Sequence, residues 1–390
     1  MVYGLSTEGY KIANQLSLRG YDVSIIDEST NVSIHLSNEI SRTYTSISSL
    51  FEDEQLLSSN QSVEESIANS NYLFFSPKIR KVGNDNRIEI NSKFIDAIKS
   101  LKKKASVVYT LPVGIGGNTE NISLLERSTG FNVGEDLFYY YMPISPISIY
   151  NSNILVGSYK SRSDEYLIKL IKHTEFSNPN FMDLVSAEIS YISLILRHYS
   201  GIASILEMSK LVNSNNYEHK LVDSFSSDMY FDDFASGLFD LRIIQSSLSG
   251  TSPLVYLVNG TVKSIEGYVK ILIDKIRLTL KRYDLKASKT KVSIGWTLDI
   301  NEIRGDKLDL SLLLETKLRD YLGDVDRYES NSTVTYNQEK THILISCSKN
   351  DYKIMSSNFN KSSDLLLLKA NSTCELSSKK TELYDNNNNS

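Results

Sequence analysis

The chain has only two cysteines among its 390 residues, Cys347 and Cys374. Two thiols in the C-terminal quarter cannot build a disulfide framework or the four-cysteine spacing of a zinc or iron–sulfur site. Histidine is also scarce, and no two histidines have the spacing of an HxxxH pair. The five are His35, His173, His198, His219 and His342. We therefore expect no metal site in this protein.

A strong charge of one sign and a long hydrophobic run are also absent. The 42 basic and 47 acidic residues leave a net charge of −5, which lacks the basic footprint of a nucleic-acid-binding domain. The longest aliphatic run, 365–368, is far below the roughly 18 apolar residues of a transmembrane helix. The N-terminus shows no basic region followed by an apolar core, so we expect no signal peptide. These absences predict a cytoplasmic globular protein that neither binds nucleic acid nor inserts into a membrane.

Strands and helices alternate in the first part of the chain and again in the last. Strands are expected at 2–4, 21–26, 72–76 and 106–110, with helices at 8–19, 95–102 and 119–127. The alternation resumes with a strand at 291–296 and a helix at 308–322. Further strands are expected at 324–328, 342–346 and 365–369. Such alternation is typical of α/β units with a parallel sheet covered on both faces.

The middle of the chain, about 164–282, has helical periodicity instead. A long helix is predicted over 181–212, and Pro253 suits the start of a second run that extends to about 282. Both runs are apolar on more than one side, which favours a bundle or a homodimer seam through these central helices. We predict a Rossmann-like domain at 1–160, a helical domain at 161–288, a second, smaller Rossmann-like domain at 289–384 and a disordered tail at 385–390.

The loop after the first strand, residues 4–9 (GLSTEG), approximates the dinucleotide-binding pattern GxGxxG. Gly4 would allow the tight turn, Gly9 would let helix and strand pack closely, and Asp27 stands where an acid binds the ribose hydroxyls of NAD. Ser6 replaces the glycine that lets the backbone approach the pyrophosphate. Glu8 adds a negative charge at the helix N-terminus. The context favours NAD binding and these two residues oppose it, so the sequence leaves the question open.

Several segments, in collinear order, resemble the UDP-glucose/GDP-mannose (nucleotide-sugar) dehydrogenase family. They are 4–27, 107–114 (VVYTLPVG), 128–136 (STGFNVGED), 186–190 (SAEIS), 258–259 (VN) and 291–304. The resemblance covers nearly the whole chain. It implies two Rossmann-like domains, NAD as cofactor, a nucleotide sugar as substrate and a dimer through the central helices. It places Thr110 and Pro112 beside the cofactor, and Asn259 and Arg304 beside the substrate.

The resemblance also implies oxidation of the primary alcohol at carbon 6 of a sugar nucleotide, through a cysteine adduct. If Asp240 matches the aspartate of the family's cysteine motif, Ser236 stands at the cysteine. The family's catalytic Cys, Lys, Asn and Glu then correspond to Ser236, Tyr191, Ile195 and Ile144. Serine lacks the acidity and leaving ability of a thiol.

Losing four catalytic positions together indicates a divergent, catalytically inactive homologue with a binding, regulatory or structural role. Its ligand would be an unidentified protein partner or a nucleotide sugar. The alternative is an active NAD-dependent 6-dehydrogenase, or an enzyme in which Ser236 and Tyr191 support altered chemistry.

Overall fold

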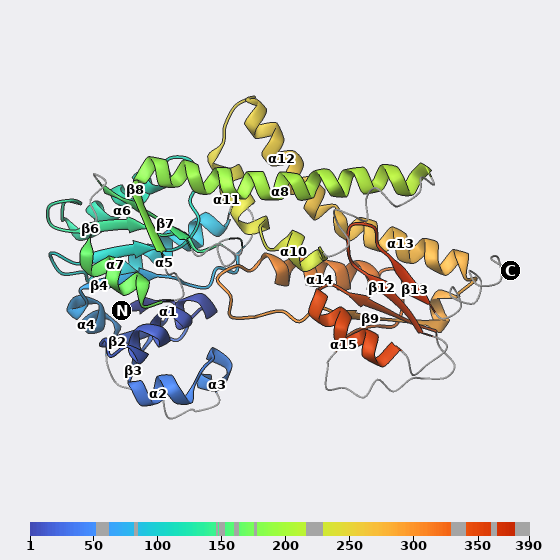
Figure 1. The fold of residues 1–390 in the computed structure, drawn as a ribbon, viewed down its shortest axis with the longest axis horizontal. Helices are drawn as coiled ribbons and strands as arrows, with labels where there is room; N and C mark the ends of the chain where they lie inside the picture. Colours follow the sequence, from blue (N-terminus) through green and yellow to red (C-terminus); the bar gives the residue numbers. More distant parts are fainter. Residues whose placement is uncertain are drawn as a thin grey trace. The chain divides into compact units, whose positions relative to one another are not determined.

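The computed structural model describes residues 1–51, 62–81, 85–145, 147, 153–159, 164–174, 178–215, 229–328, 341–359 and 365–378. Its contacts divide the chain into two compact units, drawn in Figure 1. The first consists of Met1–Arg197, Phe239–Val255 and Asp299–Gly305, and the second of His198–Leu238, Tyr256–Leu298 and Asp306–Ser390. The predicted tail at 385–390 lies outside the described residues.

The first unit contains an eight-stranded sheet in the order β3-β2-β1-β4-β5-β6-β7-β8. Its strands are β1 (Val2–Tyr3), β2 (Val23–Asp27), β3 (Val32–Leu36), β4 (Tyr72–Phe75), β5 (Ser106–Tyr109), β6 (Phe138–Tyr141), β7 (Asn153–Ser158) and β8 (Asn178–Asp183). The neighbours from β2 through β6 are parallel, whereas β3 pairs antiparallel with β2 and β7 with β6. This sheet confirms the predicted Rossmann-like α/β architecture.

Strand β8 was not expected, because it lies in the region predicted to be helical. It occupies the end of the sheet order and pairs with β7 alone. An edge strand tolerates Pro179, which could not donate a hydrogen bond in a central strand. The predicted long helix therefore starts three residues later than expected, at Leu184.

In chain order, the helices of the first unit alternate with these strands or follow them. They are α1 (Thr7–Leu18), α2 (Asn38–Thr43), α3 (Ile47–Phe51), α4 (Val63–Asn69), α5 (Asp85–Ile98), α6 (Gly117–Thr129), α7 (Glu165–Lys172), the first half of α8 (Leu184–Asn215) and most of α11 (Leu238–Ser247). The helix predicted at 95–102 is the end of α5, which begins at Asp85 and stops at Ile98.

Alternating residues of the central strands pack on opposite faces of the first sheet. Phe74 and Val108 are register neighbours that belong to a core cluster with side chains of α1 and α7. The next residues, Phe75 and Tyr109, stack at 5.3 Å between ring centroids and both contact Phe94 of α5. Helices thus cover both faces, so the loops at the strand ends are where ligands can approach.

The second unit contains a five-stranded sheet in the order β10-β9-β11-β12-β13. Its strands are β9 (Thr290–Gly295), β10 (Val325–Arg327), β11 (Thr341–Ser346), β12 (Leu365–Lys369) and β13 (Leu376–Ser378). Only the β12–β13 pair is antiparallel among these described strands. All five follow residue 289, which confirms the smaller second α/β sheet.

The second unit also holds the second half of α8, α10 (Phe231–Ala235), most of α12 (Pro253–Glu266), α13 (Tyr268–Arg282), a 3-10 turn (Ala287–Lys289), α14 (Asp306–Arg319) and α15 (Lys349–Phe359). As predicted, a helix begins at Pro253. The run expected to continue to 282 is divided at Gly267, a residue of low helix propensity, between α12 and α13.

Helix α8 runs through the cores of both units. Among the described residues, Leu184–Leu211 is the one helix that is long and apolar enough to cross a membrane, by length and composition alone. Tyr191 and Ile195 are buried in the first unit, and Tyr199 and Leu206 in the second. Core packing therefore accounts for much of its apolar character.

Candidate functional site

The turn between β1 and α1 needs glycine at two positions. Gly4 has a φ of 114°, and a Cβ there would lie 2.3 Å from the carbonyl oxygen of Ser76. A Cβ on Gly9 would lie 2.6 Å from the carbonyl oxygen of Gly4, so this glycine permits the close approach of helix and strand. The turn thus has the backbone geometry that the GxGxxG-like spacing predicts.

Ser6 caps helix α1 and does not project into open space. Its hydroxyl donates to the carbonyl oxygen of Ser76 at 2.6 Å and accepts from the Gly9 amide at 3.0 Å. The side chain is fully buried. Ser6 therefore opposes a pyrophosphate by satisfying the Gly9 amide, which the phosphate would use.

Three more amides of this turn, those of Leu5, Thr7 and Glu8, also have partners within the first unit. The Leu5 amide donates to the Glu28 carboxylate at 3.1 Å, and the Thr7 amide donates to the carbonyl oxygen of Asn301 at 2.8 Å. The Glu8 carboxylate accepts from its own amide. Because a pyrophosphate binds through such free amides at a helix N-terminus, this arrangement does not fit NAD.

Glu8 also links α1 to the segment Asp299–Gly305. Its carboxylate accepts the Ile303 amide at 3.0 Å and lies 3.7 Å from the Arg304 guanidinium. Burial raises the pKa of Glu8, an effect that Arg304 and the two amide hydrogen bonds only partly offset. A carboxylate thus occupies the position where the helix terminus would attract an anionic ligand.

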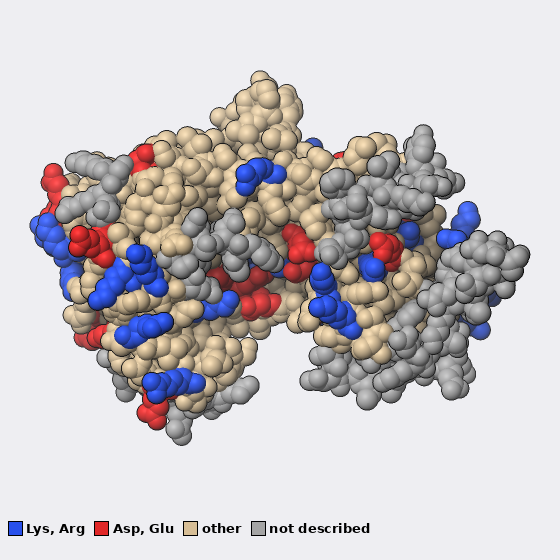
Figure 2. Space-filling view, viewed as in Figure 1, with Lys and Arg blue, Asp and Glu red and all other residues tan. Residues whose placement is uncertain are grey.

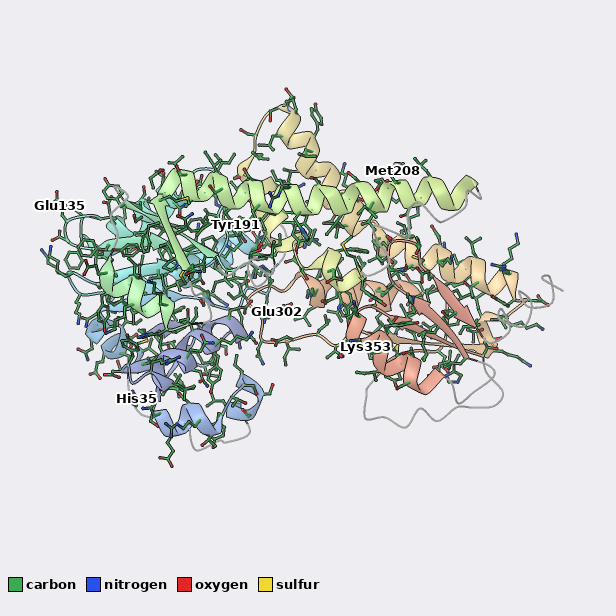
Figure 3. All side chains as sticks on the ribbon, viewed as in Figure 1. His35, Glu135, Tyr191, Met208, Glu302 and Lys353 are labelled. Carbon is green, nitrogen blue, oxygen red and sulfur yellow. The ribbon has the colours of Figure 1, made fainter. Side chains whose placement is uncertain are left out.

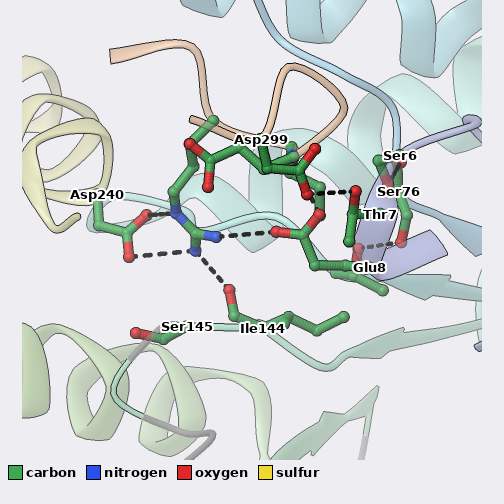
Figure 4. Close-up of polar contacts among 12 residues, drawn as sticks. Ser6, Thr7, Glu8, Ser76, Ile144, Ser145, Asp240 and Asp299 are labelled. Carbon is green, nitrogen blue, oxygen red and sulfur yellow. Dashed lines mark hydrogen bonds and ion pairs between the residues drawn. The ribbon is translucent and has the colours of Figure 1, made fainter. Parts of the chain in front are cut away.

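Arg304 lies at the centre of this cluster, with contacts to Glu8, Ile144 and Asp240, which Figure 4 labels. Its Nε donates to Asp240 Oδ1 at 2.9 Å, and its Nη2 donates to Asp240 Oδ2 at 3.3 Å and to the carbonyl oxygen of Ile144 at 2.5 Å. Burial disfavours the charged form, but Asp240, Tyr191 and Glu8 together outweigh burial and raise the pKa of Arg304. In this arrangement the guanidinium is not available to hold a substrate phosphate, the role that the resemblance implies.

Tyr191, which is marked on α8 in Figure 3, completes the cluster. Its hydroxyl donates to Asp240 Oδ2 at 2.8 Å, and it also hydrogen-bonds with Ser145. Burial, followed by the charge of Asp240, raises the pKa of Tyr191 well above its ordinary value. The phenol is therefore neutral and cannot supply the positive charge of the family's lysine.

Two other predicted catalytic positions carry no polar side chain. Ile144 contributes only its carbonyl oxygen, to Arg304, and its side chain is buried. Ile195 is also fully buried. The structure therefore brings together Tyr191, Arg304 and the backbone of Ile144 around Asp240, in a network that is closed by its own members.

Asp27 and Thr110 are likewise engaged. Asp27 accepts hydrogen bonds from the amide and hydroxyl of Ser29 and from the hydroxyl of Thr30. Burial opposes its ionisation, but these hydrogen bonds outweigh burial and lower the pKa of Asp27. Thr110 donates to the carbonyl oxygen of Phe75 at 2.7 Å. Both residues fasten strand ends in this arrangement.

Three cavities of the described residues lie in the first unit. Pro112 lines one of about 140 Å³ at the carboxyl end of β5, which is below the ~300 Å³ at which ligand pockets usually begin. A second, about 530 Å³, lies at the amino-terminal ends of β2 and β4, and a third, about 350 Å³, at the amino-terminal ends of β4, β5 and β6. None of the predicted site residues lines these two larger cavities, and both are away from the carboxyl ends of the strands, where Rossmann-like sheets bind dinucleotides.

Ser236 and Asn259 belong to the second unit. The Ser236 hydroxyl donates to the carbonyl oxygen of Asp232 at 2.7 Å at the end of α10. Asn259 is half-buried on α12. Ser236 thus has an ordinary helix-terminal hydrogen bond to a backbone carbonyl, and within the described part of the chain it does not pair with a histidine.

The N-terminus of α10 lies against the carboxyl edge of the second sheet. The Phe231 amide donates to the carbonyl oxygen of Ala370 at 2.7 Å, and the Asp232 amide donates to that of Cys347 at 2.9 Å. The indole of Trp296 donates to the Asp232 carboxylate at 2.9 Å. Trp296 and Cys347 follow β9 and β11, where the strand order of this sheet reverses, so α10 covers the expected ligand crevice of the second unit.

The two thiols are buried and unreactive. Burial, reinforced by the nearby Asp351 and Asp232, raises the pKa of Cys347 well above its ordinary value. Burial raises the pKa of Cys374 to about 11. Among the described residues, no three His, Cys, Asp or Glu side chains gather in a way that could hold a metal ion.

Sequence reasoning did not identify Glu28 or the role of Asp240. Glu28 directly follows Asp27 at the end of β2. The sequence therefore already indicated that this carboxylate lies at the carboxyl edge of the sheet, near the candidate site. In the sequence analysis, Asp240 served only to place Ser236 at the family's cysteine position. Its carboxylate was also a candidate for an ion pair with Arg304. Both pairings depend on the folded chain, because Glu28 and Asp240 lie 23 and 64 residues from their partners Leu5 and Arg304.

No protein-family model and no curated protein sequence matches this chain. Solved structures do match. A UDP-D-ManNAc dehydrogenase from Pyrococcus horikoshii is 15% identical with a TM-score of 0.60, over 90% of this chain and 96% of that one. A UDP-glucose dehydrogenase from the archaeon Pyrobaculum islandicum is 12% identical with a TM-score of 0.61, over 95% and 93% of the two chains.

A UDP-N-acetyl-mannosamine dehydrogenase from Staphylococcus aureus is 15% identical with a TM-score of 0.58, over 89% and 87% of the two chains. These likenesses cover nearly the whole of each chain. At such low identity they show that the protein has the fold of nucleotide-sugar dehydrogenases.

Proposed function

We propose that this chain is a divergent, non-catalytic member of the nucleotide-sugar dehydrogenase family, with a binding, regulatory or structural role. The observation that carries the proposal is the closed network of Tyr191, Asp240 and Arg304. By the resemblance, its members correspond to the family's lysine, motif aspartate and substrate-side arginine, and both Tyr191 and Arg304 donate to Asp240. The structural likeness to three nucleotide-sugar dehydrogenases supports the family.

The chemistry of the remaining positions supports the absence of turnover. The second oxidation needs a thiol adduct, and Ser236 offers only a hydroxyl that is bonded within its own helix. Ile195 and Ile144 offer no side-chain donor to an oxyanion or a water. A hydride acceptor would require NAD, and the turn before α1 does not fit its pyrophosphate.

The test is NADH production by the purified chain with NAD and UDP-glucose, UDP-N-acetyl-mannosamine or GDP-mannose. The proposal expects no rate above that of the Ser236→Ala variant. Steady NADH production that disappears in Ser236→Ala would contradict it and would establish the alternative, an active 6-dehydrogenase.

The partner proposals follow from the exposed side chains. Large apolar side chains on α8 are more than half exposed at Val185, Ile189, Met208 and Leu211. They support a homodimer through the central helices, as the sequence predicts. On the face drawn in Figure 2, the Lys and Arg side chains of the described residues stand in separate small groups, which supports a protein partner over nucleic acid. We further propose a cytoplasmic location.

A further inference from the structure

The N-terminus of α1 and the loop after β4 converge at the point of the first sheet where dinucleotides bind in this fold class. Strand order reverses between β1 and β4, which places the ligand crevice at the loops that follow them. We infer that Glu8 and Glu28 act as built-in substitutes for the pyrophosphate of a dinucleotide, and that they exclude NAD from this crevice. The inference concerns binding and goes beyond the proposed loss of catalysis.

Glu28 makes the contacts that a bridging phosphate would make. One carboxylate oxygen accepts the Leu5 amide at 3.1 Å and the other accepts the Lys78 amide at 2.8 Å, so it joins the turns after β1 and β4. Its side chain is only 2% exposed, and the Lys93 ammonium lies 3.6 Å away. A buried carboxylate with two amides and one cation satisfies the same donors that an anionic ligand would need.

Glu8 supplies the second negative charge, at the first turn of α1. It accepts its own amide and that of Ile303, so its carboxylate joins α1 to the segment Asp299–Gly305. The positive end of the helix dipole is therefore already compensated. A dinucleotide phosphate would meet two carboxylates and no free amide donor among Leu5, Thr7, Glu8 and Gly9.

The segment Asp299–Gly305 is fastened over this turn by several contacts. The Thr7 hydroxyl donates to Asp299 Oδ2 at 2.6 Å, and the Ile79 amide donates to the carbonyl oxygen of Ile303 at 2.8 Å. The Arg80 guanidinium donates to the carbonyl oxygens of Ile300 and Glu302 at 2.6 and 2.9 Å. Both loops that flank the crevice are thus tied to one segment of the first unit.

Helix α2 provides an internal control with the same capping sequence pattern. Ser37 accepts the Ile40 amide, as Ser6 accepts that of Gly9, and Glu39 lies in the first turn as Glu8 does in α1. Glu39 is exposed, whereas the Glu8 side chain is 18% exposed and is bonded to Ile303. Removing Glu39 therefore removes the same charge from an N-terminus outside the crevice.

The test is calorimetric titration of NAD, ADP-ribose and inorganic pyrophosphate into the wild type and into Glu8→Ala/Glu28→Ala. The wild type and the Glu39→Ala control should show no saturable binding. The double variant should bind ADP-ribose saturably, with a Kd at least about tenfold below the weakest Kd that the titration can detect, a difference that corresponds to about 1.4 kcal/mol. Circular dichroism and the fluorescence of the single tryptophan check that each variant is folded.

If Glu8→Ala/Glu28→Ala does not fold, the same titrations are made with Glu8→Gln/Glu28→Gln. This variant keeps the size of both side chains and removes both charges. Saturable binding of NAD to the wild type overturns the inference whatever the variants do. A folded double variant that binds no more tightly than the wild type also overturns it. NAD binding without NADH production would refute this inference alone, whereas NADH production would refute the proposed function.

Discussion

In the first unit, the carboxyl edge of the parallel strands is filled by charged side chains, whereas in the second it is filled by a helix and aromatic rings. In the first unit, Arg304 and Asp240 fill the edge through buried ionic hydrogen bonds, which we call the ionic closure. In the second unit, the ring of Phe231 packs with centroid distances of 4.7 Å to Trp296 and 5.0 Å to Tyr268, which we call the aromatic closure. The carboxyl edges of the two sheets are thus filled in two physically different ways, and the two closures should respond differently to mutation and to pH.

The largest effect is expected from breaking the ionic closure. Arg304→Ala leaves the Asp240 carboxylate buried without its cation, which should lower the free energy of unfolding by about 3–5 kcal/mol. Urea unfolding followed by circular dichroism measures this. Arg277→Ala is the matched control, because Arg277 forms an exposed pair with Asp274, and it should change stability by no more than about 0.5 kcal/mol. A loss below about 1 kcal/mol in Arg304→Ala would show that the buried pair does not hold the first unit together.

A somewhat smaller effect is expected from opening the aromatic closure. Phe231→Ala removes a fully buried ring and should cost about 3 kcal/mol. Trp296 is the only tryptophan, so its fluorescence reports this change in the second unit specifically. Tyr256→Ala, at a side chain that is 65% exposed, is the control and should leave the transition in place. An unchanged fluorescence transition in Phe231→Ala would mean that α10 does not seal the edge.

The two closures also differ in how far the sequence could predict them. The spacing of Gly4 and Gly9 predicts the turn correctly, because a tight turn and a close helix–strand approach are local requirements. The pairing of Arg304 with Asp240 joins residues 64 positions apart, so it depends on tertiary structure. Strand β8 escaped prediction because an edge position tolerates Pro179, which a sequence pattern alone does not reveal.

A pH-dependent effect is expected only in the ionic closure. The folded-state pKa of Glu8 is raised, mainly by burial, with Arg304 lowering it and Asp299 raising it. A raised carboxyl pKa contributes stability at pH below its unfolded value, and this contribution is lost as pH rises through the folded value. Glu8→Gln should therefore be more stable than the wild type at neutral pH, with the difference shrinking in acid. A difference that grows in acid would contradict this sign, whereas Phe231→Ala should show no such trend relative to the wild type.

The smallest effect on stability is expected from substitutions on α8, the helix that has one half in each unit. If both halves of the helix lie in a dimer seam, Val185→Glu in the first unit and Met208→Glu in the second should each shift the protein towards monomer at micromolar concentration. Leu278→Glu, at a side chain on α13 that is 63% exposed, is the control and should leave the dimer intact. Sedimentation velocity measures all three, and a wild-type monomer at that concentration would refute the seam.

Titration of NAD into the wild-type protein is the most direct test of whether the crevice is closed, because every amide from Thr7 to Gly9 already has a hydrogen-bond acceptor. We predict no saturable heat with NAD up to about 1 mM, where the binding free energy would be only about −4 kcal/mol. A saturable isotherm with a micromolar Kd would contradict it, because it would show that Glu8, Glu28 and the segment Asp299–Gly305 leave the crevice open to a dinucleotide.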